Sequence, residues 1–469
     1  MTEDPLRALR VLAGATGEAW LVGGALRDRL LGRVTSDYDV TVAKGAESVA
    51  RALARKAGGH AFMLSDQFGA WRVVSRERAW QVDLLPLSAE TIELDLARRD
   101  LTINAIAQPL RGGELIDPLG GLADLRSGSL RMASDEAFAQ DALRTIRLPR
   151  LACELGFQVE PATAWAAARG VAGLGGVASE RVFAELVRIV SADRALDGLE
   201  LMDALGVTHE VLPELVGLRG IAQSHQGRDH LDVHDPPRAV LAQTIELERD
   251  PERVLGVHAA AVAQLLASPL AGGLTRGQAL RFGALFHDIA KPQTRGVSAD
   301  ASANFIGHDE AGAQLARVAL TRLRAGERVC GHVSALTRHH LRLGFLVHQN
   351  PLGRRAIYRY LRSCEPVEVD VTVLSVADRL ATLGDGAEEA LARHLELARQ
   401  LLGEALAWRS QRPRPPVRGD RLAHELGLGS GPEIGRILAR LEEASFAGEI
   451  RTSEEAIEMA RGLLDGAAR

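Results

Sequence analysis

The pattern of apolar residues changes near residue 136. Before it, short β-rich runs such as AWLVGG, YDVTVA, WRVV, WQVDLLPL and LIDPLGG lie between helical stretches such as ALRDRLLG. After it, apolar residues recur every three or four positions, as in DALRTIRLPRLACELGF and SERVFAELVRIV, which is the spacing of amphipathic helices. The sequence therefore predicts an α+β fold, in which a head with a mixed sheet and helices precedes a long all-helical body.

The length of 469 residues is too great for one compact core and predicts several domains. The proline- and arginine-rich stretch SQRPRPPVRGD reads as a linker before a small helical tail. We expect a head over 1–135, a helical neck over 136–220, a histidine-rich helical domain over 221–409 and the tail over 410–469.

Composition excludes several classes of protein. Hydrophobic residues make up 46% and charged residues 25%, ordinary values for a globular chain, and no run approaches the roughly 18 apolar residues of a membrane span. The first residues, MTEDPLRALRVLAG, carry acids where a signal peptide carries positive charge. Three widely spaced cysteines suggest neither disulfides nor a thiolate zinc site. We expect a cytoplasmic protein without a membrane partner.

The segment LVGGALRDRLLGRVTSDYDVTV carries the clearest chemical signal. An apolar strand ends at Gly23 and Gly24, and a helix follows at once, with Arg27 in its first turn. Two glycines let the backbone approach a ligand and leave free N–H groups at a helix N-terminus, which favours phosphate binding.

Two aspartates follow in the same segment. Asp37 and Asp39 are two positions apart in a strand-like run, so both carboxylates face the same way. Convergent carboxylates beside a phosphate site are typical of two-metal phosphoryl transfer, and we expect Asp37 and Asp39 to hold Mg²⁺.

With these motifs the chain resembles the class II tRNA nucleotidyltransferase and bacterial poly(A) polymerase family. A second segment, RRDLTINA at residues 98–105, matches the family's RRDxTxNA motif. The resemblance implies that Arg99, Asp100 and Asn104 hold the triphosphate and ribose of the incoming nucleotide. It also implies a tRNA 3′ end as the substrate and Asp83 as a third catalytic carboxylate, although the family often has its acid two residues earlier.

The resemblance further implies how the base is selected. The family's Glu-Asp-x-x-Arg helix motif here reads Gln140-Asp141-Ala-Leu-Arg144. Asp141 and Arg144, three positions apart, are expected to share one helix face and to imitate a complementary base, with Arg147 one turn further on.

The connection between Asp83 and Arg98 is short, with only 14 residues. Many family members carry a longer flexible segment here, which is associated with the switch from adding C to adding A. The resemblance thus favours an enzyme that adds C residues from CTP and leaves the terminal A to a separate A-adding enzyme. A full CCA-adding enzyme that also uses ATP, an A-adding enzyme and a poly(A) polymerase are the alternatives.

The helical body contains a second motif. The run RFGALFHDIAKP resembles the signature of the HD phosphohydrolase superfamily, so the expected all-α part comprises a neck, an HD-type body and the tail. Metal ligands are expected, in the superfamily's order, at the following positions: His287, Asp288, His308, His339 or its neighbour His340, and Asp378. Imidazole and carboxylate ligands suit a divalent metal such as Mg²⁺, Mn²⁺ or Ni²⁺.

The first ligand of this second site has two candidates. Where related enzymes have a histidine, this chain has Pro236, and the alternatives are His230 and His234. The HD-type domain is therefore either a phosphohydrolase acting on RNA 3′-phosphates or 2′,3′-cyclic phosphates, or a support for RNA. The tail resembles the C-terminal module of HD-containing members and is expected to contact tRNA. A non-catalytic RNA-binding protein would not need the intact aspartate pair.

Overall fold

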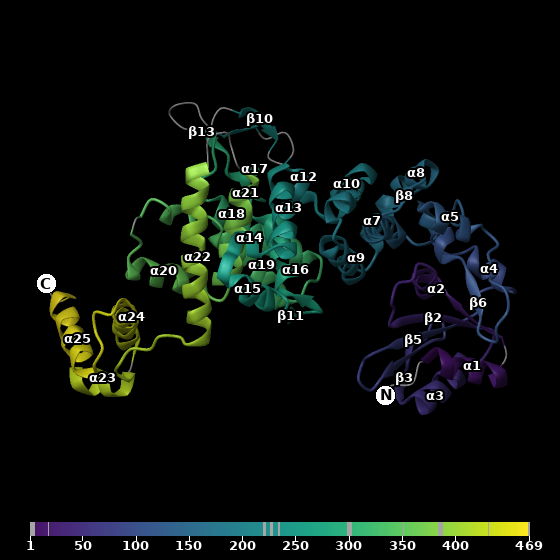
Figure 1. The fold of residues 1–469 in the computed structure, drawn as a ribbon, viewed down its shortest axis with the longest axis horizontal. Coiled ribbons are helices and arrows are strands. Elements are labelled where there is room, and N and C mark those ends of the chain that lie inside the picture. Colours follow the sequence, from purple (N-terminus) through teal and green to yellow (C-terminus); the bar gives the residue numbers. More distant parts are fainter. Residues whose placement is uncertain are drawn as a thin grey trace. The chain divides into compact units, whose positions relative to one another are not determined.

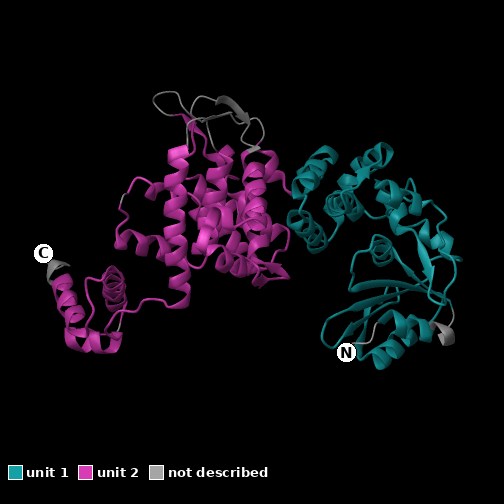
Figure 2. Cartoon of the chain, viewed as in Figure 1, with its two compact units in different colours: residues 1–211 teal, residues 212–469 magenta. Residues whose placement is uncertain are grey.

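The chain divides into two compact units, residues 1–211 and residues 212–469 (Figure 2). None of the described helices is both long and apolar enough to cross a bilayer. The structure, a computed structural model, describes residues 5–16, 18–218, 222–225, 228–232, 235–297, 303–349, 351–382, 388–429 and 431–467.

The head contains a six-stranded mixed sheet with the strand order β3-β4-β5-β2-β1-β6 (Figure 1). Strands β2 and β5 are parallel, and every other neighbouring pair is antiparallel. The strands are β1 (Ala19–Val22), β2 (Asp37–Val42), β3 (Gly59–Ser65), β4 (Ala70–Ser75), β5 (Gln81–Pro86) and β6 (Ala107–Pro109). The expected mixed sheet is confirmed.

Helices cover this sheet. Helix α3 (Ala46–Ala57) packs on β3, β4 and β5, and α1 (Pro5–Thr16) packs against α3. The apolar residues Val49, Ala50 and Leu53 of α3 are buried, as the three- and four-residue spacing requires. The remaining head helices are α2 (Gly23–Leu30), α4 (Ile92–Leu96) and α5 (Gly121–Ser127).

Two parts of the head differ from the sequence pattern. Strand β3 was not among the expected β-rich runs, because Phe62, Met63 and Leu64 follow one another without alternation. All three side chains are exposed in the structure. The strand exists because it pairs with β4 along its length. The run LIDPLGG contributes only an isolated bridge at Ile116, after which Asp117 accepts hydrogen bonds from the first backbone N–H groups of α5 at 2.7 and 2.9 Å.

The neck is helical, as predicted. Its central helix α7 buries residues at helical spacing against α9 and α10, among them Leu143, Ile146 and Leu151. The neck helices are α6 (Ala137–Gln140), α7 (Leu143–Leu155), α8 (Pro161–Gly170), α9 (Ser179–Ser191), α10 (Ala195–Leu205) and α11 (Val207–Val211); two short strands, β7 (Ser129–Leu130) and β8 (Gln158–Val159), accompany them.

The second unit is built around α16 (Arg276–Phe286), which is buried at every position except Gln278 and packs against α13, α19 and α21 (Figure 1). This position carries the following His287-Asp288 pair into the interior. The other long body helices are α13 (Asp235–Arg249), α15 (Ala259–Leu266), α18 (His308–Arg322), α19 (Glu327–His339), α20 (Arg354–Cys364), α21 (Glu368–Ala381) and α22 (Glu388–Ser410). Short elements between them are α12 (Pro213–Val216), β9 (Ala222–His225), β10 (Arg228–Asp232), α14 (Glu252–Leu255), β11 (Pro269–Ala271), β12 (Leu274–Thr275), α17 (Lys291–Thr294), β13 (Gly296–Val297) and β14 (Ala303–Asn304).

The tail forms three helices with a core of their own. Leu422, Ile437, Leu441 and Ile457 are buried together in this core. The helices are α23 (Gly419–Leu426), α24 (Pro432–Ala447) and α25 (Ser453–Ala467). The linker predicted from SQRPRPPVRGD begins at the end of α22 and leads into α23.

Candidate active site in the head and metal centre in the body

The glycine turn lies directly against the catalytic candidates. Strand β1 ends at Val22, and α2 begins at Gly23 with a φ of +66°. A Cβ atom on Gly23 would lie 3.0 Å from Nη1 of Arg99 and 3.1 Å from Oδ2 of Asp39. Only glycine combines this backbone conformation with so close an approach.

Three carboxylates meet on two neighbouring strands. Asp37 and Asp39 lie at the start of β2, and the parallel register sets Asp39 beside Asp83 of β5. Burial raises the pKa of Asp39; Arg99 opposes this increase, while Asp83 and Asp37 add to it. A divalent cation would relieve this repulsion, so the donor set fits a metal such as Mg²⁺.

Asp83 differs from the other two carboxylates because it has a protein counter-ion. Arg72 of β4 donates to both of its oxygens, from Nε at 2.6 Å and from Nη2 at 2.7 Å. The antiparallel register of β4 and β5 pairs these two residues directly. Asp83 thus lies where it was expected, while Arg72 is a neighbour that the linear sequence did not reveal.

Arg99 lies beside the carboxylates, and its hydrogen-bond donors are only partly used by the described residues. Its Nη2 is 3.5 Å from Oγ1 of Thr41 and 3.5 Å from Oδ2 of Asp95. Its buried Nε has no hydrogen-bond partner among the described residues. A buried N–H group without a partner is costly, and a phosphate oxygen would satisfy it.

The remaining predicted triphosphate and ribose residues form one hydrogen-bonded chain. Nη1 of Arg27 donates to Oδ1 of Asn104 at 2.9 Å, and Nδ2 of Asn104 donates to Oδ1 of Asp100 at 2.9 Å. Arg27 also donates to Oδ1 of Asp28 at 2.8 and 2.9 Å. Although burial favours the neutral acid, Arg147 and Asn104 hold the pKa of Asp100 below its ordinary value. These contacts hold Arg27, Asp100 and Asn104 in place through one another.

The chain of contacts continues from Arg147 into the neck. Nη1 of Arg147 lies 4.0 Å from Asp100, and Nε donates to Glu185 of α9 at 3.0 Å. Glu185 is buried and also pairs with Arg150 at 3.1 Å. Arg147, itself on the neck helix α7, therefore links the ribose-binding candidates of the head to α9 through Glu185, which the sequence patterns did not single out.

The base-reading candidates are arranged differently from the expected single helix face. Asp141 lies in extended backbone between α6 and α7, and its Oδ1 accepts a hydrogen bond from the N–H of Leu143 at 3.1 Å. Nε2 of Gln140 donates to Oε2 of Glu136 at 3.4 Å. The helix breaks here because the Asp141 side chain takes over the hydrogen bond of a backbone carbonyl.

Arg144 is anchored by backbone carbonyls. Its guanidinium donates to the carbonyl oxygens of Arg98 at 2.8 Å, of Arg99 at 3.2 Å and of Ala137 at 2.9 Å. Three of the five N–H donors of the fork are thus used, and two are left for a ligand. The anchoring fixes the direction of the fork and ties α7 to the segment that carries Arg99.

The body contains a buried group of metal-ligand side chains, Asp288, His308 and His340, which we call the histidine–aspartate cluster. Their ligand atoms lie within 4.8 Å of one another. Nε2 of His308 is 3.3 Å from Oδ1 of Asp288 and 3.3 Å from Nε2 of His340. This donor set fits a divalent transition metal or Mg²⁺.

Backbone carbonyls orient the imidazoles. Nδ1 of His287 lies 2.8 Å from the carbonyl of Ala284, and Nδ1 of His308 and of His340 lie 2.7 and 2.6 Å from carbonyls three residues earlier. Each contact leaves Nε2 for the interior of the site, as is usual for metal-binding histidines. Burial lowers the pKa of His340 to about 3, so this imidazole is neutral and able to bind a metal.

Two further predicted ligands flank the histidine–aspartate cluster. Nε2 of His287 lies 3.1 Å from Oδ2 of Asp288 and 3.9 Å from Oδ1 of Asp378. Lys291, which sequence reasoning missed, places its Nζ 2.7 Å from the same Oδ2 of Asp288. Burial raises the pKa of Asp288, but His287 and Lys291 outweigh it and hold that pKa well below its ordinary value. The three-residue spacing from Asp288 to Lys291 was the available signal.

Of the two neighbouring histidines expected as alternatives, the structure brings His340 into the histidine–aspartate cluster, and the expectation of His339 as a ligand is wrong. His339 instead faces Arg342, whose Nε donates to its Nδ1 at 3.0 Å. Successive residues of a helix point about 100° apart, so only one of the pair can face the interior. The side chains of His230 and His234 lie outside the described residues.

Comparison with known proteins agrees with this architecture. The sequence matches the "Poly A polymerase head domain" over residues 19–131, the "Probable RNA and SrmB-binding site of polymerase A" over 156–218 and the "HD domain" over 256–383. An A-adding tRNA nucleotidyltransferase of Deinococcus radiodurans is 36% identical over 93% of this chain and 94% of its own length. The chain belongs to the tRNA nucleotidyltransferase family.

Other tRNA nucleotidyltransferases are also similar to the chain. A CC-adding enzyme of Thermus thermophilus is 34% identical over 94% of this chain and 92% of its own length. A multifunctional CCA protein of Halorhodospira halophila is 34% identical over 69% of this chain and 74% of its own length. The CCA-adding enzyme of Thermotoga maritima, solved with tRNA, shares the fold with a TM-score of 0.61 at 20% identity, covering 99% of this chain and 97% of that one.

Proposed function

We propose that this tRNA nucleotidyltransferase adds C residues from CTP to the 3′ end of tRNA and stops at CC. The observation that carries the proposal is the short connection from Asp83 to Arg98. Its 14 residues leave no room for the longer flexible segment associated with the switch from C to A.

Local hydrogen bonds hold this connection in one conformation. Asp95 accepts from the backbone N–H and the hydroxyl of Ser88 at 3.0 and 2.5 Å, and Arg98 donates to the carbonyl of Ser88 at 2.7 Å. Thr91 caps α4 by accepting from the N–H of Leu94 at 3.4 Å. A segment tied at both ends in this way offers little of the movement that a change of nucleotide specificity would need.

In the proposed reaction the 3′-oxygen of tRNA forms a bond to the α-phosphorus of CTP, and pyrophosphate leaves. Asp37 and Asp39 would hold Mg²⁺, which when bound would supply positive charge near the attacking hydroxyl and the leaving pyrophosphate. The N-terminus of α2 at Gly23 and Gly24, together with Arg99, binds the triphosphate. Asp83, which is held by Arg72, contributes negative charge beside Asp39.

The other predicted residues position the nucleotide. Asp100 and Asn104 bind the ribose, and Arg27 and Arg147 hold that pair from either side. Asp141 and Arg144 read the base: the aspartate offers an acceptor, and the anchored guanidinium offers its two remaining donors. This combination of one acceptor and two donors matches the acceptors and the amino group of cytosine.

The proposal is tested by incubating the protein with tRNA transcripts that end at the discriminator base, at C and at CC. Each transcript receives CTP, ATP or both with Mg²⁺, and the products are resolved at single-nucleotide length. Extension that stops at CC in the presence of ATP is expected. Extension to CCA, or addition of A to the CC transcript alone, would contradict the CC-adding assignment.

An A-adding activity is the second candidate for the head. It is favoured by the similarity to the A-adding enzyme of Deinococcus radiodurans, which covers nearly the whole chain. The same transcripts distinguish the two activities, because an A-adding enzyme extends only the CC end and uses only ATP. A CC-adding enzyme, by contrast, requires a separate A-adding enzyme to complete the tRNA.

A second activity is proposed for the body. The histidine–aspartate cluster, flanked by His287 and Asp378, supports a metal-dependent phosphohydrolase that removes 3′-phosphates or 2′,3′-cyclic phosphates from RNA ends. A bound divalent metal (Mg²⁺, Mn²⁺ or Ni²⁺) would supply a nucleophilic water. Such an activity would prepare the free 3′-hydroxyl that the head requires.

A further inference from the structure

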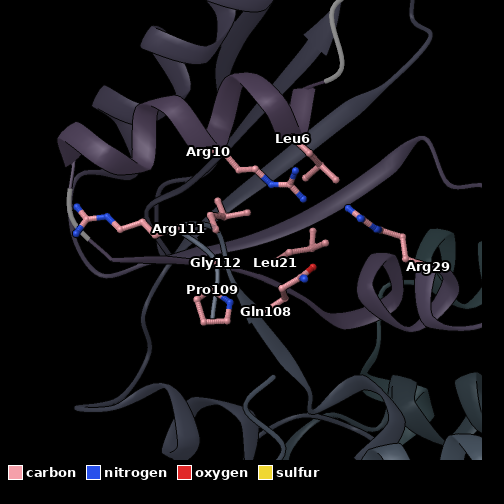
Figure 3. A pocket seen from close by; sticks show the side chains of 9 residues that line it. Leu6, Arg10, Leu21, Arg29, Gln108, Pro109, Arg111 and Gly112 are labelled. Carbon is pink, nitrogen blue, oxygen red and sulfur yellow. The ribbon is translucent and has the colours of Figure 1, made fainter. Parts of the chain in front are cut away.

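A cavity of about 350 Å³ lies in the head between α1, α2 and the end of β6 (Figure 3). Arg10 of α1 and Arg29 of α2 extend into it, and their guanidinium groups point toward one another (Figure 3). Both side chains are exposed at the mouth of the cavity. Arg111 belongs to the rim, but its side chain extends away from the other two in the same view.

This cavity is separate from the catalytic site. Asp39 pairs with Val22 in the sheet, so those two side chains share one face. Leu21, which lines the cavity, is adjacent to Val22 in β1 and therefore lies on the opposite face. The nucleotide that reacts at Asp39 cannot occupy both places.

The cavity combines an apolar floor with positively charged side chains at its mouth. Leu6, Leu21 and Leu110 are buried and form an apolar floor, on which Gln108 lies beside Leu21 in the strand register. The described residues of the lining include three arginines and no acidic side chain. Among the described residues neither Arg10 nor Arg29 has an ion-pair partner, whereas the neighbouring Arg27 pairs with Asp28.

Two guanidinium groups that face one another repel each other, and none of the described residues places an acid between them. An anion bound there would relieve the repulsion. The planar donors of arginine fit the oxygens of a phosphate group, and the apolar floor fits the ribose or base attached to it. The volume lies at the lower end of the range for small-molecule sites.

We propose that this cavity binds a phosphate-bearing nucleotide unit, with its phosphate between Arg10 and Arg29 and its apolar part on the leucine floor. The unit comes either from free nucleotide or from the backbone of the bound tRNA. The proposal holds whichever nucleotide the head adds, because none of these residues belongs to the catalytic site.

The test uses the full chain and the double variant Arg10→Glu/Arg29→Glu. The matched control is Arg7→Glu/Arg126→Glu, which changes the net charge equally at two exposed head positions outside the cavity. Binding of tRNA is measured by filter binding over a range of salt concentrations. Binding of labelled CTP and ATP without tRNA is measured by equilibrium dialysis.

If the unit comes from tRNA, the Kd for tRNA rises about tenfold relative to the control. The slope of log Kd against log salt concentration also falls, by the amount expected for the loss of about one phosphate contact. If it is free nucleotide, the stoichiometry of CTP or ATP falls from two per chain to one, and the Kd for tRNA stays unchanged. The variant Arg10→Gln/Arg29→Gln, which introduces no acid, should show the same change to a smaller extent. Equal behaviour of the cavity variants and the control in both measurements would overturn the proposal.

Discussion

Asp39 is the residue on which the head chemistry depends most. It is the carboxylate that touches the glycine turn, shares a strand face with Asp37 and lies beside Asp83. Burial is the main cause of its raised pKa; Asp83 and Asp37 add to the increase, and Arg99 opposes it. A carboxylate in such a position is better suited to binding a cation than to stabilising the fold.

We expect Asp39→Ala to abolish nucleotide incorporation while tRNA still binds, because the metal loses a ligand and the RNA-binding surface is unchanged. Incorporation and the Kd for tRNA are measured on the same preparation. Asp66→Ala removes an exposed acid from the β3–β4 turn and serves as the control, with normal activity. Normal turnover by Asp39→Ala would remove Asp39 from the site.

His394 of α22 is a buried histidine outside the histidine–aspartate cluster, 3.3 Å from the hydroxyl of Ser375. Burial, aided by Arg379, lowers its pKa to about 4. In the unfolded chain the histidine pKa is near 6.5. As the pH falls, the imidazole is therefore protonated in the unfolded chain before it is protonated in the folded chain. The stability that depends on neutral His394 is therefore complete above about pH 6.5 and is lost as the pH falls toward 4.

His394→Gln should consequently show a smaller loss of unfolding free energy between pH 7.5 and pH 5 than the unchanged protein. Urea unfolding at the two pH values measures the difference. His424→Gln, at an exposed position of α23, is the control and should keep the full pH dependence. An identical pH dependence for His394→Gln and the unchanged protein would refute the argument.

At the scale of elements, the break between α6 and α7 sets the proposed base-reading group. A continuous helix would have used the N–H of Leu143 for a backbone carbonyl and left Asp141 on an ordinary helix face. The break instead leaves Asp141 in extended backbone, and the carbonyls of Arg98, Arg99 and Ala137 fix Arg144.

Arg144→Lys should reduce discrimination between CTP and UTP, because an ammonium group keeps the charge but lacks the planar fork. The ratio of kcat/KM for the two nucleotides is the measurement. The lost carbonyl contacts should also lower the unfolding free energy by about 1–3 kcal/mol. An equal loss of activity with every nucleotide would assign Arg144 to positioning the Arg98–Arg99 segment alone.

At the scale of the whole molecule, two chemical centres lie in two separate compact units. The carboxylates of the head belong to residues 1–211, and the histidine–aspartate cluster belongs to residues 212–469. Each centre draws its ligands from its own unit. Removing the ligands of one should therefore leave the other intact.

We expect Asp288→Ala to abolish divalent-metal binding by the body and hydrolysis of RNA 2′,3′-cyclic ends, while nucleotide incorporation continues. Asp39→Ala should show the reverse pattern. Metal content after dialysis against Ni²⁺ or Mn²⁺, cyclic-phosphate hydrolysis and incorporation are measured for both variants. Hydrolysis that survives Asp288→Ala, or that disappears in Asp39→Ala, would contradict the separation of the two activities.

Much of the architecture follows from local patterns. The change of apolar spacing near residue 136 correctly predicted a sheet-containing head before a helical body. The glycine turn, the aspartates of β2 and the His287-Asp288 pair were recognisable because their chemistry depends on residues one to four positions apart. Distances of that kind are set by strand and helix geometry, which the sequence alone specifies.

Partners that come from distant segments were decided only by the tertiary structure. Arg72 faces Asp83 because of strand register, and His340 rather than His339 enters the histidine–aspartate cluster because of how α19 is turned against α16. Strand β3 exists through its pairing with β4, and Arg10 meets Arg29 only because α1 folds back over the sheet. Such contacts depend on how surfaces pack, and packing selects among side chains that local periodicity leaves equivalent.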